Sequence, residues 1–253
     1  MKKCGLLGKN IAYTKSPCIH NDYYKKNNVN LKYEVFDIDE AKIDKFFFEL
    51  KNNDIVGFNV TIPYKEKVLE YLNKLEYPAN IIGAVNTVAV KENSYLGYNT
   101  DYFGFIRSLK ENSIDVKYKK VLILGNGGSA KAVFYALRDL EAKTIDVAGR
   151  NLSKIEMEFP LVNNILNISD DLNLYDYDIL INCTPMGNIN NPIIEFKIEK
   201  TNKNLIIYDL NYEPEKTELI KLGEKLGLKC INGLDMLRFQ AYESIEIWKD
   251  TMN

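Results

Sequence analysis

Residues 121–130 read Val-Leu-Ile-Leu-Gly-Asn-Gly-Gly-Ser-Ala. The four apolar residues predict a buried strand, and the glycines after them fit the pattern G-x-G-x-x-A, which leads from a strand into a helix around a dinucleotide. Gly125 allows the tight turn, Gly127 lets the backbone approach a pyrophosphate, and Ala130 lets the helix pack closely on the strand. The N–H groups at the helix start then face the anion. We therefore predict a dinucleotide site at Gly125, Asn126, Gly127, Gly128, Ser129 and Ala130, the alternative being a glycine turn without a ligand.

The end of the next expected strand, 144–148, selects the cofactor. An NAD site places an acidic residue there for the ribose 2′-hydroxyl, whereas NADP requires a cation. Here Gly149, Arg150 and Asn151 follow the strand, Lys154 comes one turn later, and the acidic Asp146 lies within the strand. Arg150 suits bidentate binding of the 2′-phosphate, and Lys154 adds a second charge. These residues predict NADP(H), the alternative being that the two cations only begin a solvated helix.

Apolar runs and amphipathic stretches alternate on both sides of this turn, which predicts parallel strands with crossover helices. Strands are expected at 3–8, 31–38, 55–60, 120–124, 144–148, 179–182, 205–209 and 228–231. Helices are expected at 16–28, 40–51, 101–112, 129–140, 215–226 and 234–249, with helical turns at 64–72 and an extended region at 84–96. Because the rhythm restarts at the glycine turn, two α/β domains with a boundary near residue 102 fit the chain better than one sheet.

The composition excludes several classes of protein. The chain has 253 residues and a formal charge of −2, with 46% apolar residues, which argues against disorder and against binding to nucleic acid or an anionic membrane. The four cysteines lack metal-ligand spacing and His20 is the only histidine, so we expect no metal site and reduced, buried cysteines. Neither a signal peptide nor a membrane span is visible, which predicts a cytoplasmic protein.

The first half of the chain contains polar clusters that packing alone does not require. They are Thr14-Lys15-Ser16-Pro17, Asn59-Val60-Thr61-Ile62-Pro63-Tyr64-Lys65-Glu66, Gly83-Ala84-Val85-Asn86-Thr87 and Asn99-Thr100-Asp101. Each comes at a turn or at the carboxyl end of an expected strand, which is the edge where open α/β sheets bind ligands.

Together with the glycine turn, these clusters resemble the shikimate dehydrogenase family. The S-x-S-P, N-V-T-x-P-x-K, G-A-V-N-T, N-T-D and G-x-G-G motifs of that family occur in order. So do N-x-T-P-x-G at 182–187, the tyrosine segment at 209–212 and N-G-x-x-M-L-x-x-Q-A at 232–241. Eight short motifs in sequence over nearly the whole chain form a specific signal.

The resemblance implies an N-terminal α/β substrate domain and a C-terminal Rossmann-like NADP-binding domain with a cleft between them. Residues 1–102 and 234–253 would form the first domain and 103–233 the second. It implies reversible reduction of 3-dehydroshikimate to shikimate, on the route to aromatic amino acids, with Lys65 and Asp101 as the catalytic pair. The implied substrate-binding residues are Thr14, Ser16, Asn59, Thr61, Asn86, Tyr212 and Gln240. The implied cofactor-binding residues are Gly125 to Ala130, Gly149, Arg150, Asn151, Lys154, Thr184, Met186, Leu210 and Gly233.

Two positions depart from the family pattern. Thr14 replaces the first serine of S-x-S, which keeps a hydroxyl but adds a methyl group to the substrate pocket. Gly149 replaces the asparagine that usually precedes the cofactor arginine. The first departure bears on substrate preference and the second on cofactor affinity.

Lys65 suits ketone reduction, because its ammonium can stabilise the developing alkoxide and donate a proton. Pro63 predicts a helix start that places Lys65 in the first turn, where a cation opposes the helix dipole. Asp101 would orient the lysine and keep it protonated, so the two influences oppose each other. The alternatives are a solvated lysine and an aspartate that only caps a helix.

Two other functions remain open in the sequence. A quinate or dual quinate/shikimate dehydrogenase shares the motifs, and a non-catalytic NADP-binding module would need only the second half. The expected partners are a small-molecule substrate and, as assembly states, a monomer or a homodimer, without nucleic acid or membrane.

Overall fold

The computed structural model describes all residues except 51–52, 93, 195, 197 and 253. The chain divides into two compact units, one formed by Met1–Gly104 with Leu237–Asn253 and the other by Phe105–Met236. Lys51 and Asn253, which the sequence placed in a helix and in the first domain, lie outside the described residues.

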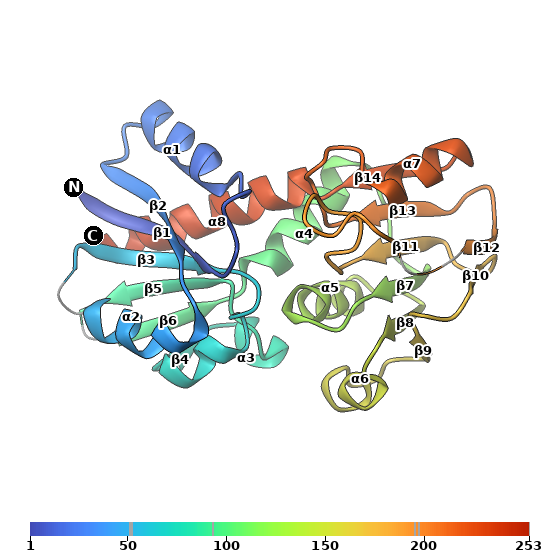
Figure 1. Cartoon of the computed structure of the whole chain (residues 1–253), viewed down its shortest axis with the longest axis horizontal. Coiled ribbons are helices and arrows are strands. Elements are labelled where there is room, and N and C mark those ends of the chain that lie inside the picture. Colours follow the sequence, from blue (N-terminus) through green and yellow to red (C-terminus); the bar gives the residue numbers. More distant parts are fainter. Residues whose placement is uncertain (51–52, 93, 195, 197, 253) are drawn as a thin grey trace. The chain divides into compact units, whose positions relative to one another are not determined.

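The first unit contains a six-stranded mixed sheet in the order β2-β1-β3-β5-β6-β4 (Figure 1). Its strands are β1 (Lys2–Gly8), β2 (Leu31–Asp37), β3 (Ile55–Val60), β4 (Lys74–Leu75), β5 (Thr87–Lys91) and β6 (Ser94–Tyr98). β1 pairs in parallel with β2 and β3, whereas β5 runs antiparallel to both of its neighbours, β3 and β6.

The β5–β6 hairpin corrects two expectations, that all strands are parallel and that 84–96 is one extended region. Only residues 92 and 93 separate the two strands, and a parallel connection needs a dozen or more residues. Glu92 has a φ of 52°, the left-handed conformation of tight hairpin turns. The short connection therefore forces an antiparallel pair.

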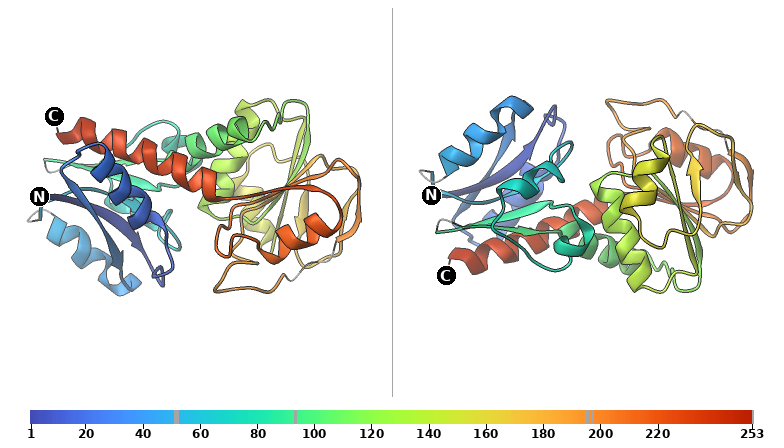
Figure 2. Two further views of the ribbon diagram at one scale, coloured as in Figure 1. Left: turned by 90° about the horizontal axis from the view of Figure 1, so that it is seen from above. Right: turned by 90° about the horizontal axis from the view of Figure 1, so that it is seen from below.

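Successive residues of β1 belong to two different cores, because side chains alternate across a strand. Cys4 and Leu6 pack with Trp248 of α8 (Leu234–Met252) and with residues of α1 (Ser16–Lys26). Leu7 packs with Phe47 of α2 (Ile43–Leu50). Figure 2 shows α1 and α8 on one face of this sheet and α2 on the other. A short 3₁₀ helix, η1 (Glu40–Lys42), precedes α2, and α3 (Ala79–Ile82) precedes the hairpin.

Two local features of this unit differ from what the residue types favour. Serine is a preferred N-cap residue, but Ser16 is the first residue of α1, and the Thr14 hydroxyl accepts the hydrogen bond from the Ser16 N–H at 3.2 Å. Lys65 is not in the first turn of a helix. The Ile62–Pro63 peptide bond is cis, Lys65 lies in a turn, and the 3₁₀ helix η2 (Lys67–Tyr71) begins two residues later. Lys65 therefore precedes the short helix and does not lie in its first turn.

The second unit contains a parallel six-stranded sheet in the order β14-β13-β11-β7-β8-β9. Read from β9, this is the strand order 3-2-1-4-5-6 of dinucleotide-binding folds, with the order reversing between β7 and β11. The strands are β7 (Lys120–Leu124), β8 (Thr144–Gly149), β9 (Ile165–Asn167), β11 (Ile179–Asn182), β13 (Ile206–Asp209) and β14 (Lys229–Asn232). A separate two-stranded sheet pairs β10 (Leu172–Leu174) with β12 (Ile198–Thr201).

Helices cover this parallel sheet. α5 (Gly128–Asp139) contacts β7 and β8, and α6 (Leu152–Glu158) contacts β8 and β9. α7 (Glu218–Lys225) places Leu219 in a core with Leu122, Leu124 and Leu180. The sequence located β7, β11, α5 and α7 within about three residues but did not identify β9, β10 and β12. Each of these strands has at most two apolar residues, whereas the equally short β11 has three in a row, and a short strand is visible in a sequence only as an apolar run.

The cysteines differ from expectation in their exposure. All four are free, but Cys4 alone is buried, Cys183 and Cys230 are half-buried, and Cys18 is exposed on α1. Among the residues that the structure describes, no helix combines the length and apolar character needed to cross a membrane.

Candidate functional site

Polar segments from distant parts of the sequence meet at one edge of the first sheet. Leu7 stands opposite Val60 in the β1–β3 pair, and Thr87 stands opposite both Asn59 of β3 and Tyr98 of β6. This register puts the carboxyl ends of β1, β3 and β6 beside the start of β5. The loops at this edge hold Thr14, Thr61, Lys65 and Asn86, and Asp101 lies in the first turn of the helix that follows β6.

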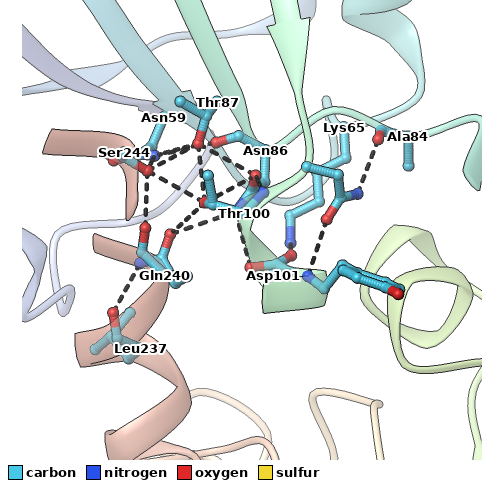
Figure 3. Close-up of polar contacts among 12 residues, drawn as sticks. Asn59, Lys65, Ala84, Asn86, Thr87, Thr100, Asp101, Leu237, Gln240 and Ser244 are labelled. Atoms are coloured by element: carbon cyan, nitrogen blue, oxygen red, sulfur yellow. Dashed lines mark hydrogen bonds and ion pairs between the residues drawn. The ribbon is translucent and has the colours of Figure 1, made fainter. Parts of the chain in front are cut away.

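Lys65 and Asp101 are brought together at this edge. The lysine Nζ forms an ion pair and hydrogen bond with Asp101 Oδ2 (Figure 3). Asp101 lies in the first turn of α4 (Thr100–Glu111), whose N–H groups stabilise a negative charge there. The two side chains are only 12% and 9% exposed. A nearly buried ammonium held against a carboxylate can deliver a proton to a bound oxygen.

Asn86 holds the other side of the Asp101 carboxylate. Its Nδ2 donates to Asp101 Oδ1 at 2.9 Å, and its Oδ1 accepts from the Thr100 N–H at 2.6 Å. The same Nδ2 lies 3.3 Å from Oε1 of Gln240 on α8. Asp101 is therefore fixed by a lysine on one oxygen and an amide on the other.

Three buried hydroxyl groups form a cluster next to Asn86. Thr87, Thr100 and Ser244 are fully buried, and their oxygens lie 2.9 to 3.1 Å apart. Asn59 donates to Thr87 and Ser244 at 2.9 and 2.8 Å, and its Oδ1 accepts from the Tyr33 hydroxyl at 2.8 Å. Figure 3 shows this cluster joining β3, β5, α4 and α8.

The sequence did not single out the members of this cluster as site residues. Thr87 and Thr100 stand inside quoted motifs, so their adjacency to Asn86 and Asp101 was the available signal. Ser244 follows Gln240 by one helical turn, and its hydroxyl donates to the Gln240 carbonyl at 2.9 Å. The i, i+4 spacing places the two side chains on one face of α8 and could have indicated Ser244.

The remaining residues predicted for the substrate fall in different places. The Thr14 hydroxyl donates to Ser16 Oγ at 3.2 Å in the loop after β1, and Thr61 directly follows β3 with its N–H bonded to Leu7. Gln240 is buried on α8 and donates to the Leu237 carbonyl at 2.9 Å. Tyr212 is half-buried and lies in the second unit.

The glycine turn of the second unit fits a pyrophosphate. Gly125 has a φ of 106°, and a Cβ on it would approach the Thr184 side chain to 3.0 Å. A Cβ on Gly127 would meet no atom within 4 Å, so the space above the backbone is open. Gly127 is the N-cap of α5, and no side chain of the described residues caps that helix. Open backbone N–H groups at a helix start suit an anionic ligand.

The residues after β8 form a short cationic segment. Asn151 caps α6 by accepting from the Lys154 N–H at 3.0 Å, and the Asn126 amide donates to the Asn151 carbonyl at 3.3 Å. This bond joins the glycine turn to the end of β8. Arg150 is exposed and forms no ion pair with a described residue, whereas Lys154 lies 3.6 Å from Glu158. Asp146 points into the domain, where Tyr177 and Asn164 bond its carboxylate.

The other predicted cofactor residues lie at the carboxyl ends of β11, β13 and β14. Thr184 and Met186 follow β11, and their carbonyls accept from the Asn211 amide at 3.0 and 2.9 Å. Gly233 packs so tightly on Leu210 that a Cβ would come within 2.0 Å of the Leu210 carbonyl oxygen. The buried Asp209 lies among these residues; burial raises the pKa of its carboxyl to about 6, against hydrogen bonds that lower it.

Comparisons with known proteins agree with this picture. The family model described as the shikimate dehydrogenase substrate binding domain matches residues 6–88. A protein of Clostridium botulinum strain Hall named shikimate dehydrogenase (NADP(+)) is 50% identical over 252 residues, which is 98% of this chain and 96% of that protein. A protein of Caldicellulosiruptor bescii with the same name is 40% identical over 262 residues, which is 100% of this chain and 91% of that protein.

Solved structures are similar over the whole length. The structure of shikimate dehydrogenase 1 of Peptoclostridium difficile matches with a TM-score of 0.88 at 35% sequence identity. The match covers 99% of this chain and 92% of that protein's chain. The structure of shikimate 5-dehydrogenase of Thermus thermophilus, in complex with NADP(H) and shikimate, matches with a TM-score of 0.84 at 28% sequence identity. This match covers 99% of this chain and 94% of that protein's chain.

Proposed function

The chain belongs to the shikimate dehydrogenase family, and on this premise we propose that it interconverts 3-dehydroshikimate and shikimate with NADP(H). It is an oxidoreductase with a Rossmann-like domain, and its cofactor is NADP(H). The sequence-based predictions of family, fold class, activity and cofactor are thereby confirmed. The roles of the individual site residues are proposals.

Lys65 and Asp101 are the proposed catalytic pair. NADPH, when bound, supplies the hydride, and the protein must position the ketone and protonate the oxygen. The Lys65 ammonium would stabilise the developing alkoxide and deliver that proton. Asp101 holds the ammonium in place and is itself held by Asn86. The ion pair at the ligand-binding edge of the sheet is the observation that carries this proposal.

The polar side chains around the pair are the proposed substrate ligands. Thr14 and Thr61 present hydroxyl groups from the loops at this edge, Ser16 presents one from the start of α1, and Asn86 and Gln240 present amides. Hydroxyls and amides suit a ring with several hydroxyl groups, because each can donate or accept. We propose Asn59 and Tyr212 in the same role, and Gly125 to Ala130, Gly149 to Asn151 and Lys154 for the cofactor, with Thr184, Met186, Leu210 and Gly233 beside the nicotinamide.

Quinate is the second candidate substrate, because of Thr14. Its methyl group changes the space next to Ser16 without removing the hydroxyl, so the hydroxyl pattern of the ring decides which substrate fits. Oxidation of shikimate and of quinate, each with NADP⁺ and with NAD⁺, separates the candidates. We expect the highest kcat/KM for shikimate with NADP⁺. A higher kcat/KM for quinate would identify quinate as the substrate instead. NADP⁺ binding without turnover of either compound would contradict an enzymatic function.

The four free cysteines support a reducing compartment, and we propose the cytoplasm. We propose a monomer or a homodimer as the assembly state, which sedimentation of the purified protein would decide.

A further inference from the structure

Asp209, the last residue of β13, is a fully buried carboxylate. Its Oδ1 accepts hydrogen bonds from the Asn182 amide at 3.0 Å and from the N–H and amide of Asn211 at 3.0 and 2.9 Å. Its Oδ2 accepts from the Thr217 hydroxyl at 2.6 Å. Among the described residues, no lysine or arginine forms an ion pair with it.

The carboxylate favours one orientation of the two asparagine amides. An ionised carboxylate only accepts hydrogen bonds, so both asparagines must turn their NH₂ groups toward it. In that orientation Asn182 Oδ1 accepts from the Thr184 N–H at 3.0 Å and from its hydroxyl at 2.6 Å. The Asn182 amide also donates to the Met186 carbonyl at 3.1 Å.

Asn211 holds the same segment from the other side, through the Thr184 and Met186 carbonyls. Gly187 ends the segment with a φ of 87°, and a Cβ on it would lie 3.9 Å from Asp209 Oδ2. The segment from Thr184 to Gly187, called here the 184–187 loop, is therefore bonded to Asp209 through two amides.

Stability alone does not select a carboxylate here. Burying a charge without a cation is costly even when it accepts several hydrogen bonds. Thr217 would cap α7 without it, since the Thr217 hydroxyl accepts from the Ile220 N–H at 3.2 Å. What the carboxylate adds is an acceptor for four donors at once, which reinforces the orientation of both amides.

We propose that Asp209 is a positioning residue whose ionised carboxylate holds the 184–187 loop in place for the cofactor. The inference rests on the proposed function, in which Thr184 and Met186 lie beside the nicotinamide. Asp209 touches neither substrate nor cofactor in this proposal. It acts only through Asn182 and Asn211.

Protonation of Asp209 should loosen the loop. Three N–H groups face Oδ1, so the proton must go to Oδ2, and the bonds from Asn182 and Asn211 to Oδ1 lose the strength that the negative charge gives them. The groups that face the carboxylate are Asn182 at the end of β11, Asn211 after β13 and Thr217 before α7, and none of them titrates. Burial raises the pKa of Asp209 to about 6, so the loop should lose its order as the pH falls through that value.

The experiment compares Asp209→Asn with Thr217→Val. Turnover of shikimate with NADP⁺ is measured from pH 5 to pH 9. In the wild type we expect kcat to fall on the acid side near pH 6. Asp209→Asn should lower the alkaline plateau of kcat about 10- to 100-fold, as expected for a misplaced reacting group. It should lose that acid limb and leave the KM for shikimate within about twofold of the wild type, because the substrate ligands of the first unit are untouched.

Thr217→Val is the matched control. It removes the cap of α7 and one donor to the carboxylate but leaves the asparagine bonds intact. Its plateau kcat should stay within about twofold of the wild type, and its acid limb should move to higher pH, because losing a donor to the ionised form raises the pKa. This shift remains measurable if Asp209→Asn does not fold.

Three results would overturn the inference. The first is a pH profile of Asp209→Asn like that of the wild type, and the second is an acid limb that does not move in Thr217→Val. The third is an equal loss of plateau kcat and of Tm in both variants, which would indicate that Asp209 acts only through the packing of α7. Absence of shikimate turnover in the wild type would contradict the proposed function instead. NADPH fluorescence titration would then test Asp209, with equal affinity in wild type and Asp209→Asn ruling it out.

Discussion

At the residue scale, chemistry explains the Lys65–Asp101 pair better than stability does. Both side chains are nearly buried, and a buried ion pair gives little net stability because desolvation offsets the attraction. The carboxylate is also bonded by Asn86 on its other oxygen, so the geometry of the pair is fixed on both sides. A fixed ammonium at a ligand-binding edge is what proton delivery requires.

Replacing Lys65 tests this interpretation. Lys65→Ala should lower kcat about 10²- to 10⁴-fold, the range of general acid–base catalysis, while NADPH still binds with an affinity close to that of the wild type. Steady-state kinetics and NADPH fluorescence titration measure the two quantities. Lys67→Ala is the control, since Lys67 stands two positions later and pairs with Glu40 on the surface. An active Lys65→Ala variant would rule out the proposed pair.

At the element scale, two glycines in the turn between β7 and α5 are required for different reasons. Gly125 needs its glycine for conformation, with a φ of 106°, and for space beside Thr184. Gly127 has a φ of −92° and open space above it, so folding does not require a glycine there. Binding does, because an added methyl group would occupy the place of the pyrophosphate.

The two glycines should therefore respond differently to a methyl group. Gly127→Ala should raise the KM for NADP⁺ at least about tenfold and leave Tm within about 1 °C of the wild type. Gly125→Ala should lower Tm by several degrees, since a non-glycine residue is strained at this φ. Differential scanning fluorimetry and kinetics measure both variants. Unchanged NADP⁺ affinity in Gly127→Ala would exclude this turn as the cofactor site.

At the scale of the whole molecule, His20 links folding to pH. It is fully buried and stacks on Tyr33 at a centroid distance of 3.9 Å. Burial lowers its pKa from 6.5 to about 3. The unfolded chain takes up a proton below about pH 6.5 that the folded chain does not bind. The free energy of unfolding therefore falls as the pH drops from about 6.5 toward 3, by at most about 1.4 kcal/mol per unit.

His20→Phe should remove this slope. Urea unfolding at pH 7 and pH 5, followed by the fluorescence of the single tryptophan, Trp248, measures the loss; Trp248 is buried 5.5 Å from the His20 ring. We expect the wild type to lose about 1.5 to 2 kcal/mol more than His20→Phe over that interval. Asp209 has the opposite effect on stability, because its raised pKa favours the folded state in acid. Since both proteins contain Asp209, its contribution cancels when their losses of stability are compared. Tyr24→Phe keeps His20 and should keep the slope; equal slopes in all three proteins would refute the argument.

The sequence by itself determined the features that depend on neighbouring residues. The strand–glycine–helix turn, the cation after β8 and the motif order indicated the family, the cofactor and the fold class. These signals are local, because a positive φ at Gly125 or a helix start at Gly128 depends on a few adjacent residues. Most long strands and helices were located for the same reason.

Only the tertiary structure decided which polar groups meet. The contact between Lys65 and Asp101 joins residues 36 positions apart, and that between Asn59 and Ser244 spans 185 positions. Both depend on the order and register of β1, β3, β5 and β6, including an antiparallel hairpin that the sequence did not predict. The bonding of the 184–187 loop to Asp209 likewise needs β11 beside β13. Strand order follows from burying both faces of a sheet at once, and no local pattern encodes that.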